Sequence, residues 1–293
     1  MSGNSLRYQF KMSSIITKLV IINGVIFLGT VLLGSLFQKD TSSFLNWFML
    51  PSDPGQFIVQ PWSLITYSFL HADLWHVLFN MLYLYWFGRF ILNLFTGKRF
   101  LTIYLLGAIS GGLLYLVGYN LFPLFSDKPG ILLGASGAVM AIVVFVAAYA
   151  PQAEMRIFTF SIKIWHIALV LVILDILRLS NNQNPGGMLA HLGGAGFGFV
   201  YARQLLKGND IGIWFENILD RVVNLFKTRK AKPFIKVHRN KATQSNTKRS
   251  KVKESKSDHQ KKVDGILDKI GKSGYESLTK AEKDYLFKAG KND

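Results

Sequence analysis

The chain has 293 residues, of which half are hydrophobic and only 17% are charged, whereas soluble domains usually carry about 25% charged residues. The charge is unevenly placed, since residues 203–293 contain 23 of the 34 Lys and Arg residues. This composition excludes a wholly soluble enzyme and a disordered chain. The lack of cysteine also excludes a disulfide-stabilised secreted module and any thiolate metal site.

The first 206 residues contain six apolar segments that are each long enough to cross a bilayer, which takes about 20 residues per helix. The predicted spans are residues 19–37, 75–95, 100–121, 131–150, 160–179 and 187–206. A continuous helix suits lipid because its backbone donors are satisfied within the segment. We therefore expect an all-α membrane protein with an N-terminal segment of residues 1–18 and a six-helix bundle over residues 19–206.

Basic residues in the short connections predict the orientation of the bundle, because excess positive charge stays cytoplasmic. The connections on one side contain Arg7, Lys11, Lys18, Lys98, Arg99 and Arg156, while those on the other side contain Lys39 and Lys128. Both termini are therefore expected in the cytoplasm. The long connection 38–74 contains the aromatic stretch 44–50, which we place in the outer interface, with an ordinary exposed loop as the alternative.

Four polar residues lie inside the predicted spans, where such groups are costly and often functional. His76 and Asn80 lie in the second span, Ser136 in the fourth and His191 in the sixth. All three spans enter from the outer side. At 1.5 Å per residue, Ser136 lies roughly 8 Å and His191 roughly 6 Å from the outer end of its span. The sequence thus predicts one polar layer just beneath the outer surface.

Small residues surround both Ser136 and His191, and they let membrane helices approach closely. Gly194 and Gly198 form a G-x-x-x-G stripe on the sixth span. If the fourth span packs closely on this stripe, Ser136 would lie beside the histidine that can act as its base. Residues 76 and 80 share one face of the second span, from which both side chains can donate to an oxyanion. Taken singly, the serine, the histidine and the glycines also fit plain packing or interfacial roles.

Three segments carry a resemblance to a known family. Residues 71–80 resemble the H-x-x-x-x-H-x-x-x-N motif of the rhomboid family, residues 134–137 its G-x-S-G motif, and residues 190–198 its A-H-x-x-G-x-x-x-G motif. The resemblance covers roughly residues 15–206, with the motifs in the family's order. It implies a six-transmembrane-helix rhomboid-like bundle that acts as an intramembrane serine protease on transmembrane segments of other proteins.

Carried over by position, the resemblance implies that Ser136 is the nucleophile and His191 the general base and acid, without a carboxylate as third member. His76, Asn80 and the backbone N–H of Ser136 would form the oxyanion hole, and no cofactor or metal is implied. The resemblance gives His71 a role in positioning the loop structure.

One position departs from the family pattern. Ser63 follows Trp62 where many members have arginine, which puts the anchoring of the first outer loop in doubt.

The fifth span contains a charged pair, Asp175 and Arg178, near its outer end. We interpret the pair as an interfacial salt bridge with Arg178 extended toward the headgroups. The alternative makes Asp175 orient a histidine as a triad carboxylate. His166, toward the other end of the span, is interpreted as structural.

The tail divides into three parts. Residues 207–227 have helical apolar spacing and predict an amphipathic interfacial helix. Residues 228–262 are basic and poor in apolar groups, so we expect a disordered linker attracted to anionic lipid, with nucleic-acid binding as the competing and less favoured interpretation. Residues 263–293 predict a small helical module whose second helix begins with a capping box at Thr279 and Glu282.

Two other functions compete with the protease. A catalytically inactive rhomboid-like protein would bind membrane clients, but such proteins generally lack the serine or the histidine. A six-helix transporter or channel predicts paired ionisable residues near the midplane or internal repeats, and the sequence contains neither. We expect transmembrane proteins as substrates and a bacterial plasma membrane as the location.

Overall fold

The computed structural model describes residues 5–37, 42–125, 130–157, 159–180, 184–226 and 252–289. The chain divides into two compact units, Met1–Arg229 and Lys230–Asp293. The first unit contains all the spans predicted above, and the second contains most of the tail. Each unit is described by itself.

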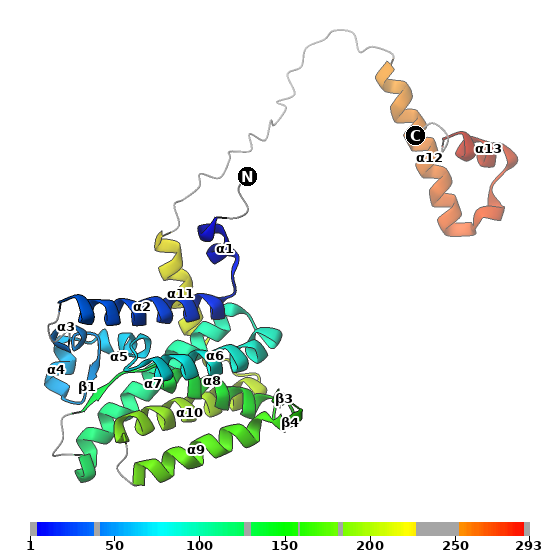
Figure 1. Cartoon of the computed structure of the whole chain (residues 1–293). Helices are drawn as coiled ribbons and strands as arrows, with labels where there is room; N and C mark the ends of the chain where they lie inside the picture. The colour runs from blue at the N-terminus through cyan, green and yellow to red at the C-terminus, as the bar shows by residue number, and fades with distance from the viewer. Residues whose placement is uncertain are drawn as a thin grey trace. The chain divides into compact units, whose positions relative to one another are not determined.

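The first unit consists of helices joined by short extended segments (Figure 1). Its α-helices are α1 Leu6–Met12, α2 Ile15–Phe37, α3 Ser42–Leu45, α4 Pro54–Val59, α5 Ser63–Thr66, α6 Leu74–Leu94, α7 Gly97–Leu121, α8 Ser136–Tyr149, α9 Ile164–Ser180, α10 Pro185–Leu206 and α11 Ile213–Phe226. The 3-10 helices are η1 Tyr67–Phe69 and η2 Pro123–Phe125, and the strands are β1 Leu50–Pro51, β2 Ile131–Leu132, β3 Glu154–Ile157 and β4 Phe160–Lys163.

Helix α8 forms the centre of this unit and packs against α6, α7, α9 and α10. It is apolar on all sides, and Ala138, Ile142 and Phe145 are at most 1% exposed. A helix that is hydrophobic all round belongs in the interior. The core therefore surrounds α8, and α2 and α9 lie on opposite sides of the bundle (Figure 1).

Helices α8 and α10 touch backbone to backbone along the predicted glycine stripe. A Cβ atom added at Gly194 would collide with the carbonyl oxygen of Gly137, and one added at Gly198 would collide with that of Ala141. Only glycine permits this approach at both positions. The predicted packing seam is confirmed.

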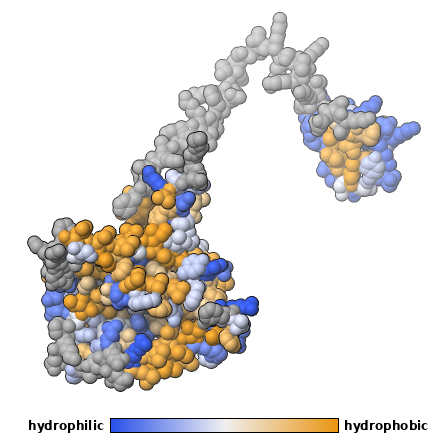
Figure 2. Space-filling view, in the orientation of Figure 1, coloured by the Kyte–Doolittle hydropathy of each residue, from blue (hydrophilic) through white to orange (hydrophobic). Residues whose placement is uncertain are grey.

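The face of the bundle seen in Figure 2 is largely apolar. Among the described residues, α2, α6 and α7 are long and apolar enough to cross a membrane, and α8 is a shorter apolar helix. Outward side chains such as Leu32 on α2 and Ile173 on α9 are 59% and 46% exposed. The structure therefore supports a membrane protein, while the count of six spans stays a prediction.

Two predicted spans begin later than expected. The fourth was expected from residue 131, but residues 131–132 form β2, which pairs with β1, and α8 begins at Ser136. The fifth was expected from residue 160, but β3 and β4 form an antiparallel hairpin and α9 begins at Ile164. Apolar composition alone does not distinguish a short strand from the end of a helix, which explains both errors.

The loop between α2 and α6 is held by hydrogen bonds to backbone carbonyls of the aromatic stretch 44–50. Gln60 Nε2 donates to Asn46 O and Met49 O, both at 3.1 Å, Trp62 Nε1 donates to Trp47 O at 2.7 Å, and Thr66 Oγ1 donates to Phe48 O at 2.8 Å.

These bonds supply the anchoring that the absent arginine put in doubt. Trp62 also stacks on Trp47 with ring centroids 6.2 Å apart, while Ser63 itself is fully buried.

Helix α11 is joined to the start of α7 by charged side chains. Arg99 pairs with Glu216 at 2.6 Å and with Asp210, and Lys98 pairs with Asp220 at 2.6 Å. The helix predicted within residues 207–227 is therefore present, and its position at the membrane interface stays a prediction.

The second unit contains α12 Val252–Ser273, the 3-10 helix η3 Tyr275–Ser277 and α13 Lys280–Ala289. The predicted capping box is confirmed, since the Thr279 N–H donates to Glu282 Oε2 at 2.7 Å and the Glu282 N–H donates to Thr279 Oγ1 at 3.3 Å. Residues 228–251 of the predicted linker lie outside the described residues, as does the last residue of the predicted helix 207–227. Because α12 begins at Val252, the remainder of the predicted linker is helical rather than disordered.

Candidate active site

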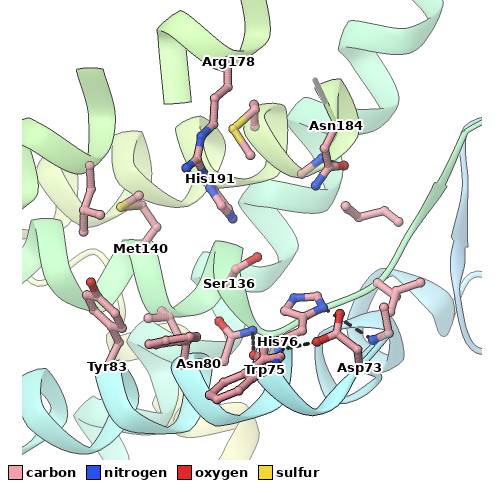
Figure 3. A pocket seen from close by; sticks show the side chains of 18 of the residues that line it. Asp73, Trp75, His76, Asn80, Tyr83, Ser136, Met140, Arg178, Asn184 and His191 are labelled. Carbon is pink, nitrogen blue, oxygen red and sulfur yellow. Dashed lines mark hydrogen bonds between the residues drawn. The ribbon is translucent and has the colours of Figure 1, made fainter. Parts of the chain in front are cut away.

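A pocket of about 690 Å³ opens between α6, α8, α9 and α10. The four polar residues singled out in the sequence, His76, Asn80, Ser136 and His191, all line it. The site lies near the N-terminal ends of α6, α8 and α10 and near the C-terminal end of α9, so all four helices bring it to one end of the bundle. Figure 3 shows Ser136 and His191 facing each other across this pocket.

Ser136 is the first residue of α8, rather than a residue inside a span. The chain reaches it through Gly134, whose φ of +123° favours glycine, and the N–H of Gly134 donates to Tyr67 O at 2.9 Å. Ala135, at the N-cap position, makes no side-chain capping bond. The first N–H groups of a helix have no partner within the helix, so the backbone N–H of Ser136 is available to a ligand.

His76 and Asn80 lie one turn apart at the start of α6. Asp73 caps this helix, its Oδ1 accepting the His76 N–H at 2.9 Å. The Ala72 N–H donates to His76 Nδ1 at 3.4 Å, a long bond that assigns the ring proton to Nε2. A Cβ at Gly134 would lie 2.7 Å from that Nε2 and 3.7 Å from Ser136 Oγ, so the ring and the hydroxyl flank the same glycine.

Asn80 is 6% exposed, and its Nδ2 donates to His76 O at 3.0 Å. An amide carries two N–H groups, so one remains for a molecule in the pocket.

His191 makes a contact that bears on two expectations from the sequence. Its Nδ1 lies 3.0 Å from Asp175 Oδ2, and Asp175 is 4% exposed. Within the described part of the chain, the ion pair of Asp175 is with His191 and not with Arg178, so the predicted interfacial salt bridge is wrong. The contact favours the alternative in which Asp175 orients a histidine, while the dyad without a carboxylate as third member stays a prediction. The rotation of α9 about its axis turns Asp175 toward α10, and hydrophobic periodicity does not specify that rotation.

His71 lies just before α6, is 8% exposed and contacts the His76 ring edge-on with centroids 5.1 Å apart. Both of its ring nitrogens are buried without a hydrogen-bond partner among the described residues. Burial lowers the pKa of His71 to about 4, and the neighbouring His76 contributes to the decrease. His71 is therefore neutral near pH 7 and buttresses His76.

Sequence reasoning missed the apolar walls of the pocket. Trp75, Phe79 and Tyr83 follow one another at four-residue intervals along α6, and Met140 faces them from α8. The spacing of the α6 residues was the available signal. Two charged residues of the pocket were also missed: Asp73 lines it before α6, and Arg178 reaches into it from α9 (Figure 3).

The arrangement combines a hydroxyl, an imidazole with a carboxylate behind it, and several N–H donors around one cavity. These are the parts that acyl transfer requires, namely a nucleophile, a base and donors for an oxyanion.

Comparison with known protein families gives two matches. A family model described as the rhomboid domain matches residues 59–208, and a second, described as a family of unknown function (DUF6576), matches residues 246–290. The first match includes α6 to α10 and therefore the whole pocket.

Several curated proteins are similar to this chain. RHOMBOID-like protein 12, mitochondrial, of Arabidopsis thaliana is 34% identical over 160 residues, which is 50% of this chain and 47% of that protein. Presenilin-associated rhomboid-like protein A, mitochondrial, of Danio rerio is 30% identical over 61% of this chain and 46% of its own length. Rhomboid protein 1, mitochondrial, of Saccharomyces cerevisiae is 28% identical over 56% of this chain and 47% of its own.

The chain thus spans about half the length of the curated relatives that it matches. Their names contradict the expected bacterial plasma membrane, since all three are mitochondrial proteins. Because the rhomboid model matches half of the sequence and includes every helix that lines the pocket, the chain belongs to the rhomboid family.

Proposed function

We propose that this protein is an intramembrane serine endopeptidase that cleaves transmembrane segments of other membrane proteins. The observation that carries the proposal is that Ser136 and His191 line the same pocket. The two residues come from α8 and α10, which the glycine contacts at residues 194 and 198 hold together. Membership of the rhomboid family supports the same reaction.

The mechanism follows from the chemistry of the lining groups. His191 accepts the proton of the Ser136 hydroxyl, and Ser136 Oγ attacks the scissile carbonyl to form a tetrahedral intermediate. The N–H groups of His76 Nε2, Asn80 Nδ2 and the Ser136 backbone stabilise the oxyanion. His191 then gives its proton to the leaving amine, and a water molecule releases the acyl group by the same steps.

Cleavage inside a membrane also needs water and an unwound substrate, because a helical carbonyl in lipid is hydrogen-bonded and dry. The pocket opens at the ends of the helices and is lined by the charged Asp73 and Arg178 as well as by apolar side chains. Such a cavity can hold water beneath the membrane surface. We infer six spans, α2 and α6 to α10, which would leave both termini on one side.

The test is labelling of the detergent-solubilised full chain with a fluorophosphonate that carries a fluorophore, combined with cleavage of a transmembrane reporter in liposomes. Ser136→Ala should abolish both signals. Ser110→Ala is the matched control, since Ser110 Oγ only donates to Gly193 O at 2.9 Å on the seam between α7 and α10. Equal labelling and cleavage in Ser136→Ala and the wild type would overturn the proposal.

The inactive, client-binding alternative predicts that the wild type itself does not react. No described feature of the pocket favours it over catalysis, since both the serine and the histidine line the cavity.

A further inference from the structure

Asp175 is a buried carboxylate on a helix whose neighbouring side chains mostly point outward. Ile173, Leu174, Ile176 and Leu177 are all more than 40% exposed, whereas Asp175 is 4% exposed. An unpaired carboxylate in such a position is costly, and a partner that hydrogen-bonds to it reduces the cost. Its partner is the ring of His191, with 3.0 Å between Oδ2 and Nδ1.

This contact fixes which nitrogen of His191 is the base. An ionised carboxylate only accepts hydrogen bonds, so Nδ1 carries the proton and donates it to Asp175. The lone pair then lies on Nε2, the nitrogen on the far side of the ring. His191 lines the pocket and its ring points toward Ser136 (Figure 3).

We propose that Asp175 is the positioning residue of the protease, which holds His191 in the tautomer that accepts the Ser136 proton and stabilises the imidazolium that forms. The inference rests on the proposed function. Asp175 is not among the residues that line the pocket, and it acts on the reaction only through His191. The proton moves from Ser136 Oγ to His191 Nε2 and then to the leaving amine.

The other ionisable groups of the pocket come from the remaining walls. His76 and Tyr83 line it from α6, Asp73 from the N-cap of that helix and Arg178 from α9, while α8 contributes the Ser136 hydroxyl. Asp73 is occupied in capping α6 through the His76 N–H. Asp175 is therefore the carboxylate that meets the His191 ring among the described residues.

The experiment measures kcat, KM and the pH profile of reporter cleavage for the wild type, Asp175→Asn and Asp175→Glu, all as full chains in liposomes. In serine proteases with a triad, replacing the aspartate by asparagine lowers kcat by about 10⁴-fold. We expect Asp175→Asn to lower kcat by at least about 10-fold with little change in KM. The acidic limb of the pH profile of this variant should move to lower pH, because an uncharged side chain at position 175 no longer favours the protonated ring of His191.

Asp175→Glu should restore part of kcat and return the acidic limb toward the wild-type position. Asp220→Asn is the matched control, because Asp220 lies on α11 and pairs with Lys98 outside the pocket. Thermal unfolding of each variant separates a loss of fold from a loss of positioning, since a purely structural role would not move the pH profile.

The outcomes separate this inference from the proposed function. The inference is overturned if folded Asp175→Asn keeps the wild-type kcat and the wild-type acidic limb while Ser136→Ala is inactive. That result would leave the proposed protease function unchanged. The inference is also overturned if Arg178→Gln moves the acidic limb as Asp175→Asn does, since Asp175 would then act as the partner of Arg178. A wild type that neither cleaves nor labels would overturn both.

Discussion

At the scale of single residues, the pocket is built from groups whose hydrogen bonds are only partly satisfied within the protein. Asn80 donates one N–H to His76 O, His76 accepts the Ala72 N–H at Nδ1, and Ser136 starts a helix without a cap. Each therefore keeps a donor for a ligand. Groups in this state are already oriented before a substrate arrives, which is what stabilisation of an oxyanion requires.

Replacing Asn80 by alanine should lower kcat for reporter cleavage by about 10²- to 10³-fold, the usual loss for one oxyanion donor. The measurement is cleavage kinetics in liposomes with KM determined separately. Asn93→Ala is the control, because Asn93 lies on the same helix and is exposed. If both substitutions lower kcat equally, Asn80 is not a donor of the oxyanion hole.

His71 should make the protein less stable in acid. Its pKa is about 4 in the folded state because of burial, against an ordinary value of about 6.5. The folded state therefore binds fewer protons than the unfolded state, so stability decreases as the pH falls from 6.5 toward 4, by at most about 3 kcal/mol. His71→Phe keeps a ring against His76 and should flatten the dependence of Tm on pH over this range.

His166→Phe is the control for this measurement, since His166 is exposed and should leave the pH dependence as in the wild type. Identical Tm curves for His71→Phe and the wild type would show that His71 is not the group that titrates.

At the scale of helices, the position of α10 against α8 determines the distance between nucleophile and base. Gly194 is three residues after His191, and its contact partner Gly137 directly follows Ser136. Any side chain at this crossing would push apart the two helices that carry the reacting groups. Packing and catalysis therefore depend on the same few atoms.

Gly194→Ala should destabilise the bundle by about 1–3 kcal/mol or more, the usual cost of overpacking a tight interior. Activity should fall with it. Gly196→Ala is the matched control, because a Cβ there has no atom within 4 Å and alanine favours the helix by up to about 1 kcal/mol. Thermal unfolding in detergent gives the Tm of each variant. Equal Tm values for Gly194→Ala and Gly196→Ala would contradict the packing seam.

At the scale of the whole first unit, charged residues join α11 to the start of α7. The pairs differ in exposure: the Arg99 and Glu216 side chains are 16% and 11% exposed, while those of Lys98 and Asp220 are 39% and 51% exposed. Burial makes the loss of one partner costly, whereas exposed pairs contribute little. The inner pair therefore holds α11 in place.

Arg99→Ala should lower stability by about 3–5 kcal/mol, because it leaves Glu216 and Asp210 without their cation. Lys98→Ala should cost about 1 kcal/mol or less. Thermal unfolding of the two variants in detergent checks the difference, and limited proteolysis after α10 should detect release of α11 only in Arg99→Ala. Equal Tm losses would contradict a central role for Arg99.

Local patterns in the sequence determined much of this protein: the apolar helices, the glycine stripe of α10, the capping box at Thr279 and the four polar residues of the pocket. These follow from periodicity and from contacts within a few positions of the chain. Only the tertiary structure decided that α8 starts at Ser136, that Trp62 and its neighbours anchor the first loop, and that Asp175 contacts His191 rather than Arg178. Those features depend on how each helix is rotated about its axis and on which distant segment packs beside it, and no spacing along the chain encodes either.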